Sequence, residues 1–300
     1  MKFFLKKDGI NQIKNLFLVI EICTFFLLHQ TILAAQSTNK KTSHSIFENE
    51  QKYYSLIWSD EFNYDGEIDT NKWFHQTQIP NGISWFNNEI QHYTNRIKNS
   101  YVSDGSLKII AQKENYTDHG ILKNYTSARI NSKFSFTYGR VEVKAKLPSG
   151  VGIWPAIWML GKGINEKGAY WQTEGFGKES WPQCGEIDIM EHWGSNQDYV
   201  QSALHTPSSF GNTKNIGGRL VKNTNRNFNI YSVEWSSEKM VFSVNDTIHY
   251  EYNPLIKNNE NWPFNSEQYL ILNIAVEPDI SPEFIQDQLE VDYIRIYQVK

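Results

Sequence analysis

The stretch GEIDIMEHWG (residues 185–194) alternates between acidic and apolar residues and then breaks that alternation once. Residues i and i+2 of a β-strand share a face, so Glu186 and Asp188 point to the same side. Strict alternation would turn Glu191 to the opposite side. A one-residue bulge at Ile189-Met190 would bring the third carboxylate back to the shared face. The stretch therefore predicts a bulged strand with three carboxylates on one face and apolar side chains on the other.

Three clustered carboxylates repel one another, so the arrangement points to a chemical role. Two carboxylates can cleave a glycosidic bond, one attacking the sugar carbon and the other protonating the leaving oxygen. A third can hydrogen-bond one partner and push their pKa values apart. A metal site is an alternative, although only His192 and His205 lie nearby in the sequence. A solvated acidic strand edge is another, and the interleaved apolar residues make it less favoured.

The chain from Tyr53 onward is a series of short apolar or alternating runs separated by clusters of Gly, Asn, Asp, Ser and Pro. The runs include SLKIIAQK, RINSKFSF, GRVEVKAKL, YSVEWSS, KMVFSVND, YLILNIAV and EVDYIRIYQ. Many short strands at regular spacing are typical of an all-β sandwich or barrel. No long run shows helical periodicity after the N-terminal segment. We expect one domain over residues 53–300, whose closing segment VDYIRIYQV pairs with the first strand.

The overall composition excludes some functions. The chain has 300 residues and a formal net charge of -4, without the basic excess expected of a nucleic-acid-binding protein. Its 10 Trp, 16 Tyr and 17 Phe residues can build a large core and can also provide stacking platforms for sugars. The two cysteines are Cys23 and Cys184. If the N-terminal segment is removed, Cys184 is alone and no intramolecular disulfide forms.

The N-terminal segment has the pattern of a secretory signal. Four lysines among the first 14 residues precede the apolar run LFLVIEICTFFLL (residues 16–28), and small residues follow at Ala34-Ala35. The run is short for a membrane span, which needs about 20 residues. We expect a signal peptide over residues 1–35, a polar linker over 36–52, and a secreted or periplasmic protein with no membrane attachment after cleavage. Glu21 weakens this interpretation, and an uncleaved anchor or a buried helix are the alternatives.

An ordered series of motifs carries a family resemblance along nearly all of the chain after the linker. The motifs are WSDEF (58–62), WFNNEIQHYT (85–94), DGSLKI (104–109), TSARI (126–130), YGRVEVKAKLPSGVGIWPAIWML (138–160), GEIDIMEHWG, WPF (262–264), LILNIAV (270–276) and VDYIRIYQ (291–298). In these motifs the sequence resembles glycoside hydrolase family 16, the laminarinase-type β-glucanases. The resemblance implies a β-jelly-roll sandwich of two antiparallel sheets with a concave substrate cleft. It also implies a retaining endo-β-1,3-glucanase that cleaves laminarin-like glucans by double displacement.

The resemblance also implies roles for individual residues. Glu186 resembles the nucleophile, Glu191 the acid/base and Asp188 the assisting carboxylate. The residues implied to bind substrate are Trp85, Asn87, Asn88 and Glu89 on a cleft-edge loop, Arg129 on a neighbouring strand, Trp154 and Trp158 as stacking platforms, Trp181 as a subsite wall, and His205 facing the catalytic strand. A core role for the two tryptophans and a structural role for the histidine remain the alternatives.

Many members of the family hold one structural Ca²⁺ away from the cleft, and no cofactor takes part in catalysis. The resemblance places its ligands at Glu61, the Gly105 carbonyl and Asp292, because Ca²⁺ prefers oxygen ligands. Structural salt bridges are the alternative for the two acids. We expect a monomer whose partner is a β-glucan polysaccharide.

One departure from the family leaves the substrate open. After LILNIAV the family commonly continues with Gly-Gly, whereas this chain reads Glu277-Pro278-Asp279. Larger residues there would narrow one end of the cleft. Another β-linked polysaccharide, either mixed-linkage β-1,3-1,4-glucan or a galactan such as agarose or carrageenan, is therefore an alternative substrate. A non-catalytic glucan-binding protein is an alternative of a different class, and it is disfavoured because all three carboxylates are retained.

Overall fold

The computed structural model describes residues 54–80 and 82–300, and its strands form two sheets. The ten-stranded sheet runs in the order β15 (Thr247–Tyr252), β14 (Met240–Val244), β13 (Asn229–Trp235), β8 (Gly139–Lys146), β17 (Gln286–Val299), β5 (Ser106–Asp118), β6 (Ile121–Ser127) and β3 (His92–Tyr93), with β1 (Tyr54–Asp60) on β17 and β4 (Ser100–Ser103) on β5. The seven-stranded sheet runs in the order β12 (Ile216–Leu220), β11 (Tyr199–His205), β10 (Glu186–Glu191), β9 (Ile153–Gly161), β16 (Gln268–Val276), β7 (Arg129–Phe136) and β2 (Trp73–His75).

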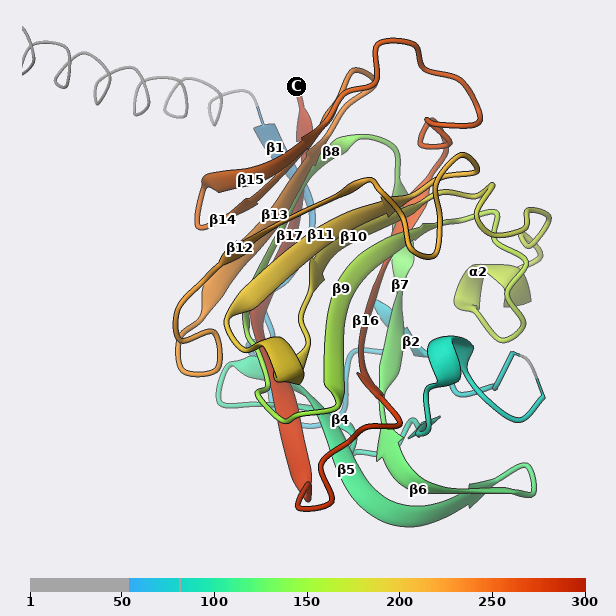
Figure 1. Cartoon of the computed structure of the whole chain (residues 1–300), viewed down its shortest axis with the longest axis vertical. Helices are drawn as coiled ribbons and strands as arrows, with labels where there is room; N and C mark the ends of the chain where they lie inside the picture. The colour runs from blue at the N-terminus through green and yellow to red at the C-terminus, as the bar shows by residue number, and fades with distance from the viewer. Residues whose placement is uncertain (1–53, 81) are drawn as a thin grey trace, which may run out of the picture. The chain divides into compact units, whose positions relative to one another are not determined.

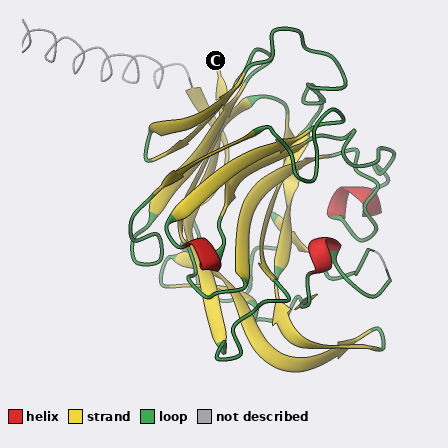
Figure 2. Cartoon of the chain, in the orientation of Figure 1, coloured by secondary structure: helices red, strands yellow, loops and turns green. Residues whose placement is uncertain are grey.

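Antiparallel pairing dominates both sheets. Every pairing in the seven-stranded sheet is antiparallel, while the two-residue β3 runs parallel to β6 in the other sheet. Figure 1 shows β11, β10, β9, β16 and β7 side by side. Helix in the described residues is confined to η2 (Phe86–Asn88), α2 (Tyr170–Thr173) and η3 (Gly194–Asn196), and strands joined by loops make up the rest in Figure 2. The prediction of an all-β, two-sheet sandwich is confirmed.

The core lies between the two sheets because the strands alternate their side chains. In β8, Val141, Val143 and Ala145 are fully buried in the core, and the intervening charged residues are half-buried on the other face. In β16 every residue is buried. Its apolar even-numbered residues from Leu270 to Val276 join the core, and Asn273 belongs to the other face, which lines the cleft described below. This strand therefore supplies both the core and the cleft floor.

The closing strand is placed as the sequence predicted. Strand β17 pairs with β1 and also lies between β8 and β5, so the last segment of the chain is central to its sheet. The predicted signal peptide over residues 1–35 and linker over 36–52 lie outside the described residues. Within the described part of the chain, no helix has the length and apolar character needed to cross a membrane.

Candidate active site

Strand β10 contains the bulge that the sequence predicted. On its β9 side, Asp188 pairs with Trp158 and Met190 pairs with the next residue along β9, so Ile189 is the extra residue. Ile189 and Met190 are both buried in the core between the sheets. Because two successive side chains enter the core, the following residue, Glu191, returns to the face that carries Glu186 and Asp188. The predicted bulge is confirmed.

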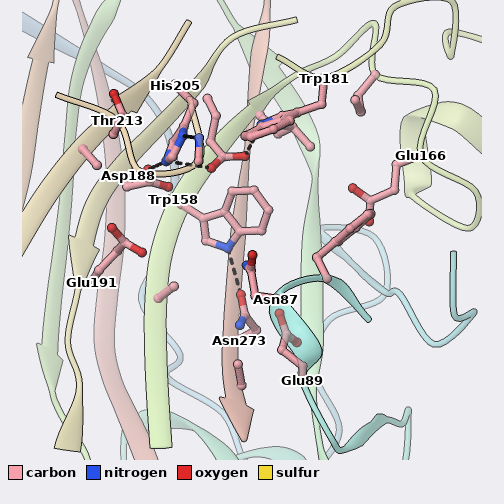
Figure 3. A pocket seen from close by; sticks show the side chains of 18 of the residues that line it. Asn87, Glu89, Trp158, Glu166, Trp181, Asp188, Glu191, His205, Thr213 and Asn273 are labelled. Carbon is pink, nitrogen blue, oxygen red and sulfur yellow. Dashed lines mark hydrogen bonds and ion pairs between the residues drawn. The ribbon is translucent and has the colours of Figure 1, made fainter. Parts of the chain in front are cut away.

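The three carboxylates line one cleft of about 1250 Å³ on the face of the seven-stranded sheet that points away from the core. The lining also contains Asn87, Glu89, Arg129, Trp154, Trp158, Trp181 and His205, all of which were predicted to bind substrate. Figure 3 shows Asp188 and Glu191 on one side of Trp158, and Asn87 and Glu89 beyond its other side. The cleft therefore joins the catalytic strand to the loop that holds η2.

Glu186 has two close partners. The indole Nε1 of Trp181 donates a hydrogen bond to Glu186 Oε2 over 3.0 Å, and His205 Nε2 lies 3.5 Å from Glu186 Oε1. Burial and the nearby Asp188 carboxylate raise the pKa of Glu186, whereas His205 and the Trp181 hydrogen bond oppose that rise. Trp181 is 40% exposed, so its ring also forms part of the cleft wall.

Glu191 has a weaker set of partners. Its hydrogen bond comes from the amide of Gln201 on β11, with 3.5 Å between Gln201 Nε2 and Glu191 Oε2. Burial, followed by repulsion from Asp188, raises the pKa of Glu191 to about 8. Burial also raises the pKa of Glu186 to about 8, so the two glutamates differ in their hydrogen bonds and not in their pKa values. The longer bond at Glu191 stabilises a negative charge less and favours a proton there.

Asp188 lies between the two glutamates on the same strand, and its side chain is buried. His205 Nε2 lies 3.3 Å from Asp188 Oδ2, and the same atom is also close to Glu186. Burial raises the pKa of Asp188. The prediction that His205 faces the catalytic strand is therefore confirmed, and the histidine bridges two of the three acids (Figure 3).

A hydrogen-bonded chain fixes the tryptophan in the middle of the cleft. Trp158 Nε1 donates to Asn273 Oδ1 over 2.8 Å, and Asn273 Nδ2 donates to the Tyr93 hydroxyl over 3.1 Å. The Tyr93 hydroxyl in turn donates to Glu89 Oε2 over 2.9 Å. Asn273 was missed at the sequence level. A polar residue inside the apolar run LILNIAV was the signal that could have found it.

Arg129 lines the cleft but is only 3% exposed. Its Nε donates to Gln76 Oε1 over 3.0 Å, and its Nη2 donates to Glu166 Oε1 over 2.9 Å. Its guanidinium carbon lies 4.8 Å from the centroid of the Trp158 ring. Gln76 and Glu166 were missed, because partners so far apart in the sequence leave no local pattern. Arg129, fixed by Gln76 and Glu166, thus holds the Trp158 ring in place.

Comparison with known proteins agrees with this geometry. Residues 86–295 match the family model described as glycosyl hydrolases family 16. The chain belongs to this family. It is 38% identical over 262 residues to a β-glucanase from Rhodothermus marinus, covering 82% of this chain and 86% of that protein. It is 34% identical to glucan endo-1,3-β-glucosidase A1 from Niallia circulans, covering 81% of this chain and 38% of that longer protein.

A solved structure of the same family also resembles the chain closely. A variant of LamA from Zobellia galactanivorans, in complex with laminaritriose and laminaritetraose, is 47% identical and has a TM-score of 0.75. The match covers 82% of this chain and all of that chain, at 100%. The jelly-roll sandwich implied by the family resemblance is therefore confirmed.

Two of the predicted substrate-binding residues of this family 16 member do not line the cleft. Trp85 is 2% exposed and packs edge-on against Tyr93, with 4.6 Å between the ring centroids. Its ring supports the wall from behind, where it cannot reach a sugar. Asn88 is exposed but lies outside the cleft lining. The loop has a left-handed backbone at Asn87 and Asn88, and only Asn87 is brought to the cleft.

The two tryptophans of β9 both reach the cleft, although they have different neighbours. Trp154 stacks on Trp193, with ring centroids 5.3 Å apart, and Trp158 lies between Asn273 and Arg129. Both rings are half-buried, so each keeps an accessible surface in the cleft. The sequence pattern fits either a core or a cleft role for these tryptophans. The residues between them on β9 are buried, and both tryptophans line the cleft, so the structure assigns them to the cleft.

The predicted calcium ligands have partners of their own. The Glu61 carboxylate forms two hydrogen bonds with Arg295, of 3.0 and 2.8 Å, and the Asp292 carboxylate pairs with Lys144 Nζ at 2.6 Å. These salt bridges match the alternative considered for both acids. Calcium at Glu61, Gly105 and Asp292 would compete with both cations, and it stays a prediction. Thermal unfolding with and without added Ca²⁺ tests it.

Within the described residues, one group of His, Cys, Asp and Glu side chains has the spacing of a metal site. Glu186, Asp188 and His205 each offer a ligand atom, and these atoms lie within 4.8 Å of one another. The metal alternative raised by the sequence therefore involves the same residues as the acid/base interpretation. Dialysis against EDTA separates them, since acid/base hydrolysis keeps its rate.

Proposed function

We propose that the protein is a retaining endo-β-1,3-glucanase that hydrolyses internal bonds of laminarin-like glucans by double displacement. The observation that carries the proposal is the bulge in β10, which gathers Glu186, Asp188 and Glu191 in one cleft. Relatives named as glucanases and a structural neighbour complexed with laminarin oligosaccharides support the same substrate class.

The first step forms a covalent glycosyl-enzyme. The ionised Glu186 carboxylate attacks the anomeric carbon, and the bond from that carbon to the leaving oxygen breaks. The protonated carboxyl group of Glu191 gives its proton to the leaving oxygen, so the departing glucan leaves as an alcohol. Trp158 and Trp154 provide flat apolar surfaces that hold glucosyl rings in the cleft during this step.

The second step releases the sugar with its original configuration. Glu191, now ionised, takes a proton from a water molecule that attacks the anomeric carbon. The bond to Glu186 breaks, and the Glu186 carboxylate is restored together with the protonated Glu191. Two inversions at one carbon give net retention.

The surroundings of the two glutamates explain this division of roles. Glu186 accepts a 3.0 Å hydrogen bond from the Trp181 indole and lies beside His205, and both oppose the rise that burial causes in its pKa. Glu191 accepts a longer contact of 3.5 Å from Gln201, and His205 and the Trp154 indole also oppose the rise in its pKa. Enzymes assign acid and base roles by placing similar groups in such different environments. We expect activity to fall as pH rises through the pKa of Glu191, at about 8, because the general acid is then deprotonated.

Replacement of the nucleophile tests the proposal. Glu186→Gln keeps the shape of the side chain but removes the attacking carboxylate, so laminarin hydrolysis should fall by a factor of about 10³ or more. Glu283→Gln, a change at an exposed acid outside the cleft, is the matched control and should keep the wild-type rate. Initial products analysed by NMR should be β-anomers. Unchanged hydrolysis by Glu186→Gln, or α-anomers from the wild type, would overturn the proposal.

A substrate panel settles the alternatives left by the sequence. The wild-type rates on laminarin, mixed-linkage β-1,3-1,4-glucan, agarose and carrageenan should rank laminarin first. A higher rate on a galactan would reassign the substrate while keeping the mechanism. Binding to laminarin without turnover would favour the non-catalytic glucan-binding protein.

We also propose that the enzyme acts outside the cytoplasm as a monomer. The basic and apolar N-terminal pattern of residues 1–35 supports export, since a polysaccharide substrate is too large to enter a cell. N-terminal sequencing of the exported protein and its elution in size-exclusion chromatography test the two statements. A retained N-terminus or a dimeric elution volume would count against them.

A further inference from the structure

The bulge in β10 has a dedicated hydrogen-bond partner on its buried side. On the β11 side, Asp188 pairs with Ala203 and Glu191 pairs with Gln201, so Ser202 alone stands opposite the two residues between them. The Ser202 hydroxyl donates to the carbonyl oxygen of Ile189, the extra residue of the bulge, over 2.8 Å. Ser202 is fully buried. A side chain here supplies the bond that an interrupted ladder needs.

A histidine from the ten-stranded sheet extends this set of hydrogen bonds. His249 on β15 places its Nε2 2.9 Å from the Ser202 hydroxyl oxygen. The single hydroxyl proton is already used on the Ile189 carbonyl, so His249 Nε2 must carry a proton and donate it to Ser202. This fixes the tautomer with Nδ1 unprotonated, and Nδ1 is buried without a hydrogen-bond partner. A proton on Nδ1 would have no acceptor, which agrees with burial lowering the pKa of His249 to about 4.

We propose that Ser202 and His249 are positioning residues, which hold the bulge of β10 so that Glu191 is aimed at the leaving-group oxygen. This inference rests on the proposed glucanase function. Neither residue lines the cleft, and both act through the Ile189 carbonyl. The hydrogen bond that Glu191 accepts from Gln201 is long, at 3.5 Å, whereas Glu186 accepts a 3.0 Å bond from Trp181, so the aim of Glu191 depends more on its backbone.

The physical reason is that the aim of Glu191 depends on a local backbone irregularity. Regular pairing would carry Glu191 to the core and Met190 to the cleft, since a one-residue shift exchanges the two faces of a strand. The hydrogen bonds from His249 to Ser202 and from Ser202 to the Ile189 carbonyl hold the extra residue of the bulge from the core side. Without them the Ile189 carbonyl loses a buried donor, and the bulge is held less firmly. A displacement of about 1 Å can lower a rate by about 10²-fold.

The test compares two substrates that differ in their need for a proton. Laminarin has a poor leaving group and needs Glu191 as an acid, whereas dinitrophenyl laminaribioside releases a stable anion without protonation. Ser202→Ala should lower kcat on laminarin by about 10- to 100-fold with KM changed less than about 2-fold. The first-turnover release of dinitrophenolate should change by less than about 3-fold, because that step uses only Glu186.

The conservative variants refine the comparison. His249→Leu removes the donor to Ser202 and should repeat the effect of Ser202→Ala at about 3- to 10-fold. His249→Gln offers an amide N–H in place of Nε2 and should restore most of the rate. Ser232→Ala is the matched control, since it removes a buried hydroxyl that bonds Ser243 over 2.7 Å in the other sheet. It should leave the ratio of the two substrates at the wild-type value.

The outcomes separate this inference from the proposed function. Wild-type rates on laminarin decide whether the protein is a glucanase. Among active variants, equal losses on both substrates, or a ratio shifted as much by Ser232→Ala as by Ser202→Ala, would overturn the positioning role. If Ser202→Ala does not fold, the His249 pair decides the question, because the Ser202 hydroxyl stays in place. Failure of His249→Gln to recover the rate lost in His249→Leu would then overturn it.

Discussion

Each sheet contains a cluster of charged residues, and the two clusters are built in opposite ways. In the ten-stranded sheet, Arg140 on β8 donates to Glu142 over 2.7 Å, to Glu234 over 2.5 Å and to Asp246 over 2.9 Å. One cation is thus surrounded by three carboxylates. In the seven-stranded sheet, three carboxylates lie on the same six-residue strand, with one histidine between two of them.

The difference shows in the pKa shifts. Hydrogen bonds and charge attraction from its acidic partners raise the pKa of Arg140 against burial, which favours its charged form. Burial raises the pKa of Glu186, Asp188 and Glu191, which disfavours the charged forms of these carboxylates. Opposite charges stabilise the cluster around Arg140, and like charges destabilise the cluster on β10. A protein retains such a destabilising cluster where it is needed for function.

The largest expected effect comes from removing the acid. Glu191→Gln should lower kcat on laminarin by about 10³-fold, because general acid catalysis typically contributes about 10² to 10⁴. Steady-state kinetics and circular dichroism measure rate and fold separately. The matched variant Glu234→Gln in the other sheet should keep kcat. If both variants lost activity equally, the contrast between the sheets would have no catalytic meaning.

The second effect is the mirror image, a loss of stability without a loss of rate. Arg140→Met leaves three carboxylates without their cation, and breaking a buried pair destabilises by about 3–5 kcal/mol. Because Glu234 and Asp246 keep partial solvent contact, we expect about 2–3 kcal/mol here. Chemical denaturation measures it, and kcat at 25 °C should stay within about 2-fold of the wild type. A changed kcat with an unchanged midpoint would contradict this prediction.

The sequence was sufficient to predict those features that depend on local periodicity. Glu186 and Asp188 at strand spacing, with Glu191 one residue late, required a bulge, and β10 has one at the predicted place. The run VDYIRIYQV alternates well enough to be predicted as the closing strand, and β17 does pair with β1. Alternation is a property of neighbours in the chain, so it can be read without a structure.

Features set by distant residues could not be predicted in the same way. Trp85 is an aromatic residue on the predicted cleft-edge loop, but Tyr93 and Arg129 pack against its ring. Glu166 and Gln76 join Arg129 although they are 90 residues apart, and His249 reaches Ser202 from the other sheet. Whether a polar residue supports or lines a site depends on how the two sheets pack, which one sequence does not specify.

A smaller effect concerns the pH dependence of stability. The pKa of Glu191 rises from 4.5 to about 8 on folding. Between these values the unfolded chain has lost a proton that the folded chain keeps, so stability falls as pH rises. Glu191→Gln abolishes this loss and should be more stable than the wild type at pH 8 by about 1–2 kcal/mol.

Thermal unfolding at two pH values measures this trend. The gain in Tm of Glu191→Gln should be near zero at about pH 4 and reach about 2–6 °C at about pH 8. The control Glu283→Gln should show no such trend, because that acid is exposed. A gain that shrank with rising pH would mean that the acidic cluster does not destabilise the sheet.

The smallest effect lies at the end of the cleft, where Glu277 replaces the glycine usual in the family. Glu277 is half-buried in the cleft lining, and burial, Asp279 and Glu89 raise its pKa. Its carboxylate extends the acidic character of the seven-stranded sheet and should repel anionic glycans. Glu277→Gln should raise kcat/KM on carboxymethylated β-1,3-glucan, relative to laminarin, by about 2- to 5-fold at low salt. Added salt screens the charge and should remove this gain, whereas a gain that persists at high salt would indicate altered cleft shape instead of charge.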